Sequence, residues 1–458
     1  MPNHVQYTTG TSSNAVPGVA SELAQSSNAD FGIEEDDLDP EGIYTILCTA
    51  PIVDNNLKEN TLGFVLQSYS RWAIVAIFEP LKIARTVKER IIRQFSSEDT
   101  RMRCILRANV MDMFGRQLLV DETRSLIVAR LISEVRENSS AFLVQSSYGG
   151  FASELARDDA MRVLDSTLEL MTLQIYTQPM AACIQLLEDA APVFRRACSE
   201  PLGQPLDLLG TLLETDLNIR HYATIDIMTS ALTGRATLFK YRLPFSFELS
   251  ERVFRAQEDC GLYWLHGLPD QFIIMIAWIN SLCETPEYRT NSELITQIEE
   301  TLQQIRININ QPSDSALRIG RTVVQECWRY AMLVYLYMVL CGANANDPRV
   351  VRAQKGFMRL AKGIKPGRNP DAFLVSPMII VGVATSKERD RGILRQRVLN
   401  LREYATPSTA GNDSWIQVED VWARSKAEGR AAVWSDLRIA CFRVSDDLHK
   451  LVSHTPSI

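Results

Sequence analysis

Histidine and acidic side chains often hold metals or carry out catalysis, and the sequence places few of them at spacings that suit either task. His449 and His454 are separated by four residues, the gap found in half of a zinc finger. No cysteine pair precedes them, which favours a chance spacing over a metal site. His221 and His266 stand alone, and we interpret each as a hydrogen-bonded structural histidine.

Nine cysteines are scattered through the chain, and none of them forms a C-x-x-C pair. An odd and dispersed set is not the pattern of a disulfide framework, and it fits a reducing compartment. We interpret most of these thiols as small buried hydrophobic groups. They are Cys48, Cys104, Cys183, Cys198, Cys260, Cys283, Cys327, Cys341 and Cys441.

An all-helical enzyme that holds diphosphate through Mg²⁺, such as a terpenoid synthase, is the enzyme alternative. Its metal sites need spaced carboxylates on one helix face. Here the run DDLD at residues 36–39 is followed by Pro40, so the last carboxylate of DDxxD is missing. Asn291 and Glu299 have the outer spacing of the second motif, but Ile295 replaces its hydroxyl ligand. Both matches fail.

Other catalytic signatures are also missing from the sequence. There is no G-x-x-x-x-G-K-[ST] phosphate loop, no G-x-G-x-x-G after a strand and no G-x-S-x-G nucleophile elbow. We therefore assign no catalytic residue and no metal ligand, expect no cofactor, and expect a protein that is not an enzyme.

Basic residues recur every three or four positions between 349 and 368, and no acid lies between Asp347 and Asp371. At helical spacing the early members form a cationic stripe on one helix face. One interpretation is a site for an anionic partner segment or a phosphorylated ligand. The alternative is a solvated face opposite buried apolar residues. The stripe consists of Arg349, Arg352, Lys355, Arg359 and Lys362.

The net charge of −7 is concentrated at the N-terminus. Residues 1–57 contain nine acids and no Lys or Arg, so the remainder has 48 basic and 46 acidic residues. A nearly neutral body is not typical of a DNA-binding module, which is usually strongly basic. The longest apolar runs, residues 272–278 and 331–342, are shorter than the roughly 20 residues that span a bilayer. We expect a soluble intracellular protein.

The elements that position these residues are expected to be helices. Residues 1–57 predict a disordered acidic tail, because they lack periodicity and mix acids with spaced apolar residues. Two interpretations of this tail are open. It is either an activation segment or a solvated leader whose last residues dock on the body. From residue 58 to 458 apolar residues recur at helical spacing. We predict an all-α fold, a compact multi-helix array.

Two helices are predicted in particular. Thr290, Asn291 or Ser292 is expected to cap a helix running to about residue 306, and residues 322–340 are apolar on nearly all sides, which indicates a buried helix.

Several segments resemble the fungal-specific transcription factor domain, the regulatory region that usually follows a Zn₂Cys₆ zinc cluster. The resemblance covers roughly residues 60–445 and depends on the order of segments that are individually unspecific. The segments are HYATIDIMTSALTGRATLFKY (221–241), GLYWLHGLPDQFIIMIAWINSLC (261–283), WRYA (328–331) leading into VYLYMVLCGA (334–343), DPRV (347–350), SPMIIVGVATSKERDR (376–391) and VWARSKAEGRAAVWSDLRIA (421–440).

The residues that carry this resemblance are expected to be structural. Large aromatic residues of a central helix supply buried area, and Gly and Pro mark turns. Asp226 and Arg235 are expected to pair near such a turn. The family-like set is Asp226, Arg235, His266, Pro269, Trp328, Tyr335, Arg391 and Trp434.

The resemblance implies a nuclear regulator of RNA polymerase II transcription, acting through intramolecular contacts, protein partners or a small effector. Partners would be the transcription machinery or a DNA-bound regulator. The sequence contains no C-x2-C-x6-C cluster, so we expect no direct DNA binding by this chain. Because its apolar runs are too short to span a bilayer, we also expect no membrane association. A non-transcriptional helical interaction scaffold is the alternative, and an all-α enzyme a remote one. Target genes, effector, sign of regulation and oligomeric state stay open, as do shuttling between nucleus and cytoplasm and the presence of an upstream exon that encodes a zinc cluster.

Overall fold

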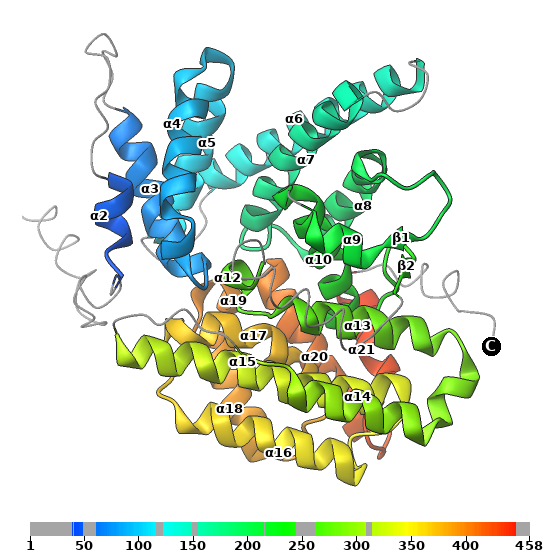
Figure 1. Cartoon of the computed structure of the whole chain (residues 1–458). Helices are drawn as coiled ribbons and strands as arrows, with labels where there is room; N and C mark the ends of the chain where they lie inside the picture. The colour runs from blue at the N-terminus through cyan, green and yellow to red at the C-terminus, as the bar shows by residue number, and fades with distance from the viewer. Residues whose placement is uncertain are drawn as a thin grey trace, which may run out of the picture. The chain divides into compact units, whose positions relative to one another are not determined.

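The computed structural model describes residues 39, 41–48, 61–115, 122–148, 154–214, 216–243, 262–307 and 314–445. The chain divides into two units, Met1–Pro40 and Glu41–Ile458, and all described residues except Asp39 belong to the second. The described residues are 79% helical and include almost no strand, which confirms the all-α prediction (Figure 1). Most of the DDLD run, His449 and His454 lie outside them.

The first group of helices packs around α3. The α3 helix lies along α5, and α2 contacts both α3 and α4. Ile43 and Leu47 of α2 are each only 1% exposed, because they pack with Ala84 at the start of α4. The elements are α2 (Ile43–Cys48), α3 (Thr61–Ala76), η2 (Pro80–Lys82), α4 (Ala84–Ser96) and α5 (Glu98–Gly115).

The docked helix α2 falls inside the range expected to be an acidic tail. Glu41, just before it, forms a bidentate ion pair with Arg321 of a helix distant in sequence, with Nη2–Oε2 and Nη1–Oε1 distances of 2.6 and 3.0 Å. Arg321 Nε also donates to the carbonyl oxygen of Phe78 at 3.0 Å. The Arg321 side chain is 2% exposed. Residues 41–48 are therefore anchored to the body.

The second group contains two long helices, and the described β structure consists of one pair of short strands. The α7 helix packs along α8, and Leu206 of β1 pairs with Tyr241 of β2 in parallel. The elements are α6 (Glu122–Tyr148), α7 (Glu154–Gln174), α8 (Met180–Ala197), β1 (Leu206–Asp207), α9 (Leu208–Leu213), α10 (Leu217–Thr233) and β2 (Tyr241–Arg242).

The third group contains the two helices predicted in particular. Asn291 is the cap of α14, since its side chain accepts from Leu294 N at 3.0 Å. The predicted buried helix is the second half of α15, and it continues as a π-helical turn, η4. The elements are α12 (Tyr263–His266), α13 (Asp270–Cys283), η3 (Pro286–Thr290), α14 (Ser292–Gln304), α15 (Ser315–Tyr335) and η4 (Leu336–Leu340).

The last group packs on α15, which contacts both α16 and α17. Gly356 permits the close approach of α16, because a Cβ atom there would collide with the ring of Tyr330. The last two described helices of the chain, α20 and α21, pack against each other. The helices are α16 (Pro348–Gly363), α17 (Arg368–Val383), α18 (Glu388–Leu399), α19 (Arg402–Ala405), α20 (Ala410–Ala427) and α21 (Ser435–Val444).

The apolar faces of these helices form a large common core that includes Trp328 and Trp415, each 1% exposed. The cysteines among the described residues are free thiols, and Cys104, Cys327 and Cys441 are buried. Burial raises the pKa of Cys104 to about 11, so that thiol is a neutral packing group. None of the described helices has the length and hydropathy needed to cross a bilayer.

Candidate functional site

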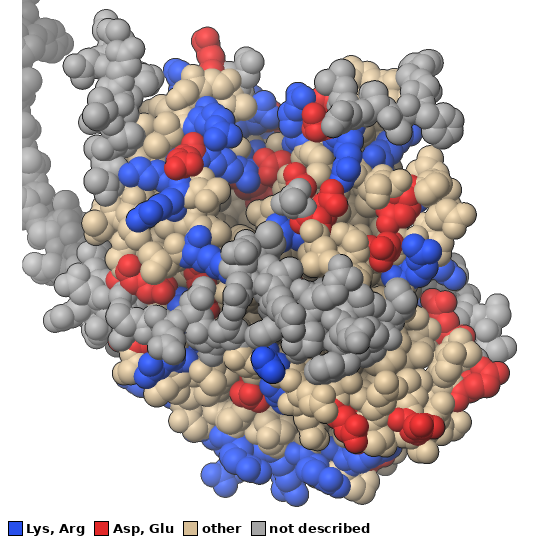
Figure 2. All heavy atoms as spheres, viewed as in Figure 1, with Lys and Arg blue, Asp and Glu red and all other residues tan. Residues whose placement is uncertain are grey.

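The cationic stripe lies on α16, and its middle members reach solvent. Arg352, Lys355 and Arg359 are exposed, and none of them has an ion-pair partner among the described residues. The opposite face of the helix is buried, with Val350 and Phe357 at 0% exposure. Figure 2 shows basic side chains gathered at the lower edge of the view, over the position of α16. The central cations are thus open to an anionic partner.

The two ends of the stripe are held by neighbouring carboxylates. Arg349 Nη2 lies 3.0 Å from Asp347 Oδ2, and its guanidinium lies 5.0 Å from the ring centre of Tyr337. Lys362 Nζ lies 2.7 Å from Oδ1 of Asp390 on α18. Burial acts to raise the pKa of Asp390, but hydrogen bonds, chiefly from Lys362, hold it below its usual value. These two cations are therefore paired within the chain, although each side chain is 39% exposed.

A hollow of about 320 Å³ opens beside the start of α18. Three segments line it: the loop before α16, the connection between α17 and α18, and the turn between α20 and α21. Ala345 N donates to the carbonyl oxygen of Ala432 at 2.9 Å, which ties the first segment to the third. The charged residues of its wall are Glu388, Arg391, Lys426 and Arg430. Basic groups therefore outnumber acidic ones there.

Arg391, one of the family-like residues, is held in the wall of this hollow. Its guanidinium lies 5.0 Å from the ring centre of Trp422, and its Nε donates to the carbonyl oxygen of Thr385 at 2.9 Å. The side chain is 16% exposed, and Nη1 lies 3.8 Å from Glu388 Oε2, beyond hydrogen-bond distance. Burial lowers the pKa of Arg391. Its two terminal nitrogens have no hydrogen-bond acceptor among the described residues.

Ser425, on the last turn of α20, also lines the hollow. The residue is 6% exposed, and its Oγ atom has no hydrogen-bond partner among the described residues. A buried hydroxyl without a partner is destabilising, because it gives up its hydrogen bonds to water. The sequence analysis did not select Ser425, since a serine near a helix end gives no signal of its burial.

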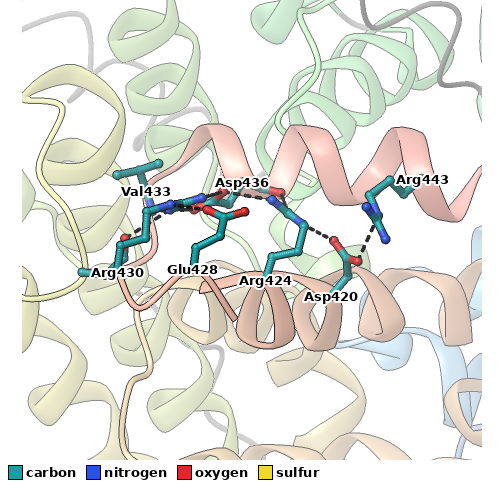
Figure 3. Close-up of polar contacts among 8 residues, drawn as sticks. Asp420, Arg424, Glu428, Arg430, Val433, Asp436 and Arg443 are labelled. Atoms are coloured by element: carbon teal, nitrogen blue, oxygen red, sulfur yellow. Dashed lines mark hydrogen bonds and ion pairs between the residues drawn. The ribbon is translucent and has the colours of Figure 1, made fainter. Parts of the chain in front are cut away.

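A network of ion pairs joins α20 to α21 next to the hollow (Figure 3). Asp436, 1% exposed, lies 3.0 Å from Arg424 Nη1 and 2.6 Å from Arg430 Nη2. Arg430 Nε also donates to Glu428 at 2.6 Å. Burial acts to raise the pKa of Asp436, but the hydrogen bonds from Arg430 and from backbone lower it. The network extends from Arg424 through Asp420 to the last turn of α21.

The expected pairing of Asp226 with Arg235 is wrong. Asp226 on α10 is 2% exposed and accepts from Leu238 N and from the hydroxyl of Tyr241, each at 2.8 Å. Burial raises its pKa to about 6. Arg235 instead lies 3.5 Å from Glu188. The pairing failed because the chain after Arg235 folds back and brings its own donors to the carboxylate.

His266 ends α12 beside His221 of α10, with ring centroids 5.4 Å apart. Both Nε2 atoms are buried without a hydrogen-bond partner among the described residues. Burial lowers the pKa of His221 to about 3 and that of His266 to about 4, so both are neutral. Pro269, three residues later, is the N-cap residue of α13.

The remaining family-like aromatic residues are packing groups. Tyr335 stacks edge-on with Trp434 at 5.0 Å and donates through its hydroxyl to Asn280 at 2.5 Å. Trp328 lies on α15 and is buried in the hydrophobic core. Among the family-like residues, the structure brings Tyr335 and Trp434 into contact and places Arg391 at the hollow.

Clusters of side chains that could bind a metal ion are absent from the described part of the chain. No group of three or more His, Cys, Asp or Glu residues suitable for a metal ion occurs among those residues.

The fold and these sites define an all-helical module with open cationic groups on its surface. A family model described as the fungal specific transcription factor domain matches residues 134–445. The match covers more than half of the chain, so the chain belongs to this family. The family is one of transcription regulators and is non-enzymatic. No curated protein and no solved structure gives a significant match.

Proposed function

We propose that this chain is the regulatory body of a fungal zinc-cluster type regulator of RNA polymerase II transcription. It acts in the nucleus through protein contacts and does not bind DNA through a zinc cluster of its own. The family match over residues 134–445 is the observation that carries the proposal. The near-neutral charge from residue 58 onward supports action through partners rather than on DNA.

The central stripe, Arg352, Lys355 and Arg359, is the proposed contact for an acidic segment of a protein partner. These three cations lie on one face of α16 and are exposed. An acidic partner would gain from them mainly in association rate and specificity, since exposed charges are screened by salt.

A reporter experiment tests the regulatory role. Residues 1–458, 39–458 and 58–458 are each fused to an unrelated DNA-binding domain and assayed on a reporter gene. The second fusion keeps Glu41 and α2, whereas the third leaves the buried Arg321 without its carboxylate partner. We expect the first two fusions to change reporter output. If no fusion changes it under any nutrient condition, the non-transcriptional scaffold becomes the better interpretation.

The stripe is tested in the 1–458 fusion by the triple variant R352Q/K355Q/R359Q. We expect reporter output to change several-fold while the melting temperature stays constant. The control triple variant, R85Q/R93Q/R130Q, removes the same charge from exposed positions that lack ion pairs among the described residues. An equal effect of both triple variants would refute a specific role for α16.

A further inference from the structure

We propose that the hollow beside α18 is a binding site for a small molecule with a carboxylate or phosphate group, and that Arg391 and Ser425 bind this group. The volume of about 320 Å³ is at the lower end of the range for small-molecule sites, which is about 300–1,000 Å³. The hollow therefore suits a metabolite rather than a peptide segment.

The first reason is the state of the Arg391 guanidinium. Contact with the Trp422 ring and the hydrogen bond to Thr385 fix its plane, while both terminal nitrogens lack an acceptor. Trp422 is itself fixed, because its Nε1 donates to the carbonyl oxygen of Gly382 at 2.8 Å. A planar guanidinium with two open nitrogens matches the two oxygens of a carboxylate or phosphate. Little side-chain entropy remains to be lost on binding.

The second, independent reason is the buried hydroxyl of Ser425. The residue lines the same hollow, and its Oγ atom is fully buried and has no hydrogen-bond partner among the described residues. Rotation of the side chain about χ1 would turn the hydroxyl into the hollow, where a ligand oxygen would supply the missing acceptor. Ser386 and Lys426 are exposed on the same wall and would contact the outer part of the ligand.

The third reason is the balance of charge in the wall. Glu388 is the acidic lining residue, and its side chain is 78% exposed and so can swing into solvent. Arg430 already donates hydrogen bonds to Asp436 and Glu428. It therefore adds positive electrostatic potential to the hollow rather than free hydrogen-bond donors. Val383 and the alanines of the turn supply apolar contact for a short carbon chain. An anion with a small aliphatic part fits this combination.

Calorimetric titration of the purified full-length chain tests the proposal. The probes are inorganic phosphate, glycerol 3-phosphate and glutarate, with glycerol and glutaramide as uncharged counterparts. We expect at least one anion to bind saturably with a Kd at or below about 1 mM, and the uncharged counterparts not to bind. The preferred anion distinguishes a phosphate ester from a carboxylate. If none of the three anions binds, the proposal is wrong.

Variants separate this site from general anion binding. We expect R391Q to weaken binding at least tenfold and S425A to weaken it several-fold. R391K keeps the charge but loses the planar fork, and it should also bind more weakly. The matched control is R389Q, because Arg389 lies on the same helix, is exposed and does not line the hollow. Circular dichroism and melting temperatures establish that each variant is folded.

Unchanged affinity in both R391Q and S425A would overturn the assignment, as would an equal loss in R389Q. Binding is measured on the isolated chain, without a reporter. The proposal can therefore fail while the transcriptional function holds, and the reverse outcome is equally detectable.

Discussion

Arg430 and Arg391 line the same hollow but have opposite surroundings. Arg430 donates to Asp436 and Glu428, and these hydrogen bonds raise its pKa. Arg391 has one backbone oxygen and an exposed carboxylate at 3.8 Å, and burial lowers its pKa. The first arginine keeps its charge and stabilises the folded network by donating to ionised carboxylates. The second is desolvated with little compensation inside the chain, which is the state expected of a group that binds a ligand.

The comparison teaches how to distinguish two roles of an arginine that lines a hollow. If carboxylates of the chain already accept its hydrogen bonds, the role is structural; if they do not, the arginine is available to bind a ligand. Figure 3 shows the structural case, in which carboxylates of α20 and α21 alternate with guanidinium groups. The α16 stripe is a third case, since Arg352 and its neighbours are exposed and lose little solvation. Such exposed cations add little to stability whether or not they are paired.

The largest effect is expected from breaking the network with Asp436→Ala. The change removes the carboxylate that accepts from Arg424, Arg430 and the backbone of Val433. Because Asp436 is 1% exposed, we expect the free energy of unfolding to fall by about 3 kcal/mol. Urea denaturation measures it. The control is Glu428→Ala. Loss of this exposed carboxylate should lower the free energy of unfolding by no more than about 0.5 kcal/mol. Equal losses would contradict the structural role assigned to Asp436.

A second prediction contrasts Asp436 with Asp226, whose carboxylate accepts only from neutral donors. The pKa of Asp226 is raised to about 6, so the folded state keeps its proton where the unfolded state loses it. The unfolding free energy of the wild type relative to D226N should rise as pH falls from about 6 to 4. Relative to D436N it should fall as pH drops below about 4, because the Asp436 pKa is lowered.

Urea denaturation of the three proteins at a series of pH values measures both trends, and their difference cancels the titration of other groups. The buried His221 and His266 are such groups, since both have lowered pKa values. Parallel curves for the wild type and D226N would show that burial does not shift Asp226.

The smallest effect is expected from Ser425→Ala. The Ser425 Oγ atom has no partner among the described residues, so its removal should lower the unfolding free energy by no more than about 0.5 kcal/mol, or raise it. Ser230→Ala is the matched control, because that hydroxyl donates to the carbonyl oxygen of Arg235 at 2.7 Å. The control should lose about 1 kcal/mol. If S425A loses as much as S230A, Ser425 is hydrogen-bonded within the fold.

The sequence predicted local features well where short-range physics decides them. Helical spacing of apolar residues predicted the all-α fold, and the candidates for the α14 cap included Asn291. The 3–4 residue spacing of basic groups predicted a stripe on one helix face, and its central cations are exposed. Each of these follows from the 3.6-residue period of the helix or from bonds within one turn.

The sequence did not predict which charged groups would be matched. Asp226 was assigned to Arg235, nine positions away, yet its partners are backbone donors and Tyr241 from the segment that folds back. The spacing of Asp420 and Arg424 follows the i,i+4 rule, but Asp436 joins them only because α20 and α21 pack together. Nothing in its neighbours along the chain marked Ser425 as buried without a partner.

By itself, the sequence determined the helices, the uneven distribution of charge and the resemblance to the fungal transcription factor family, which the family match confirms. Tertiary structure alone decided that carboxylates accept hydrogen bonds from Arg430 but not from Arg391, and that three separate segments line a hollow. The physical reason is that helix formation depends on residues within a few positions of one another. Burial and hydrogen-bond satisfaction depend instead on which distant helices come into contact.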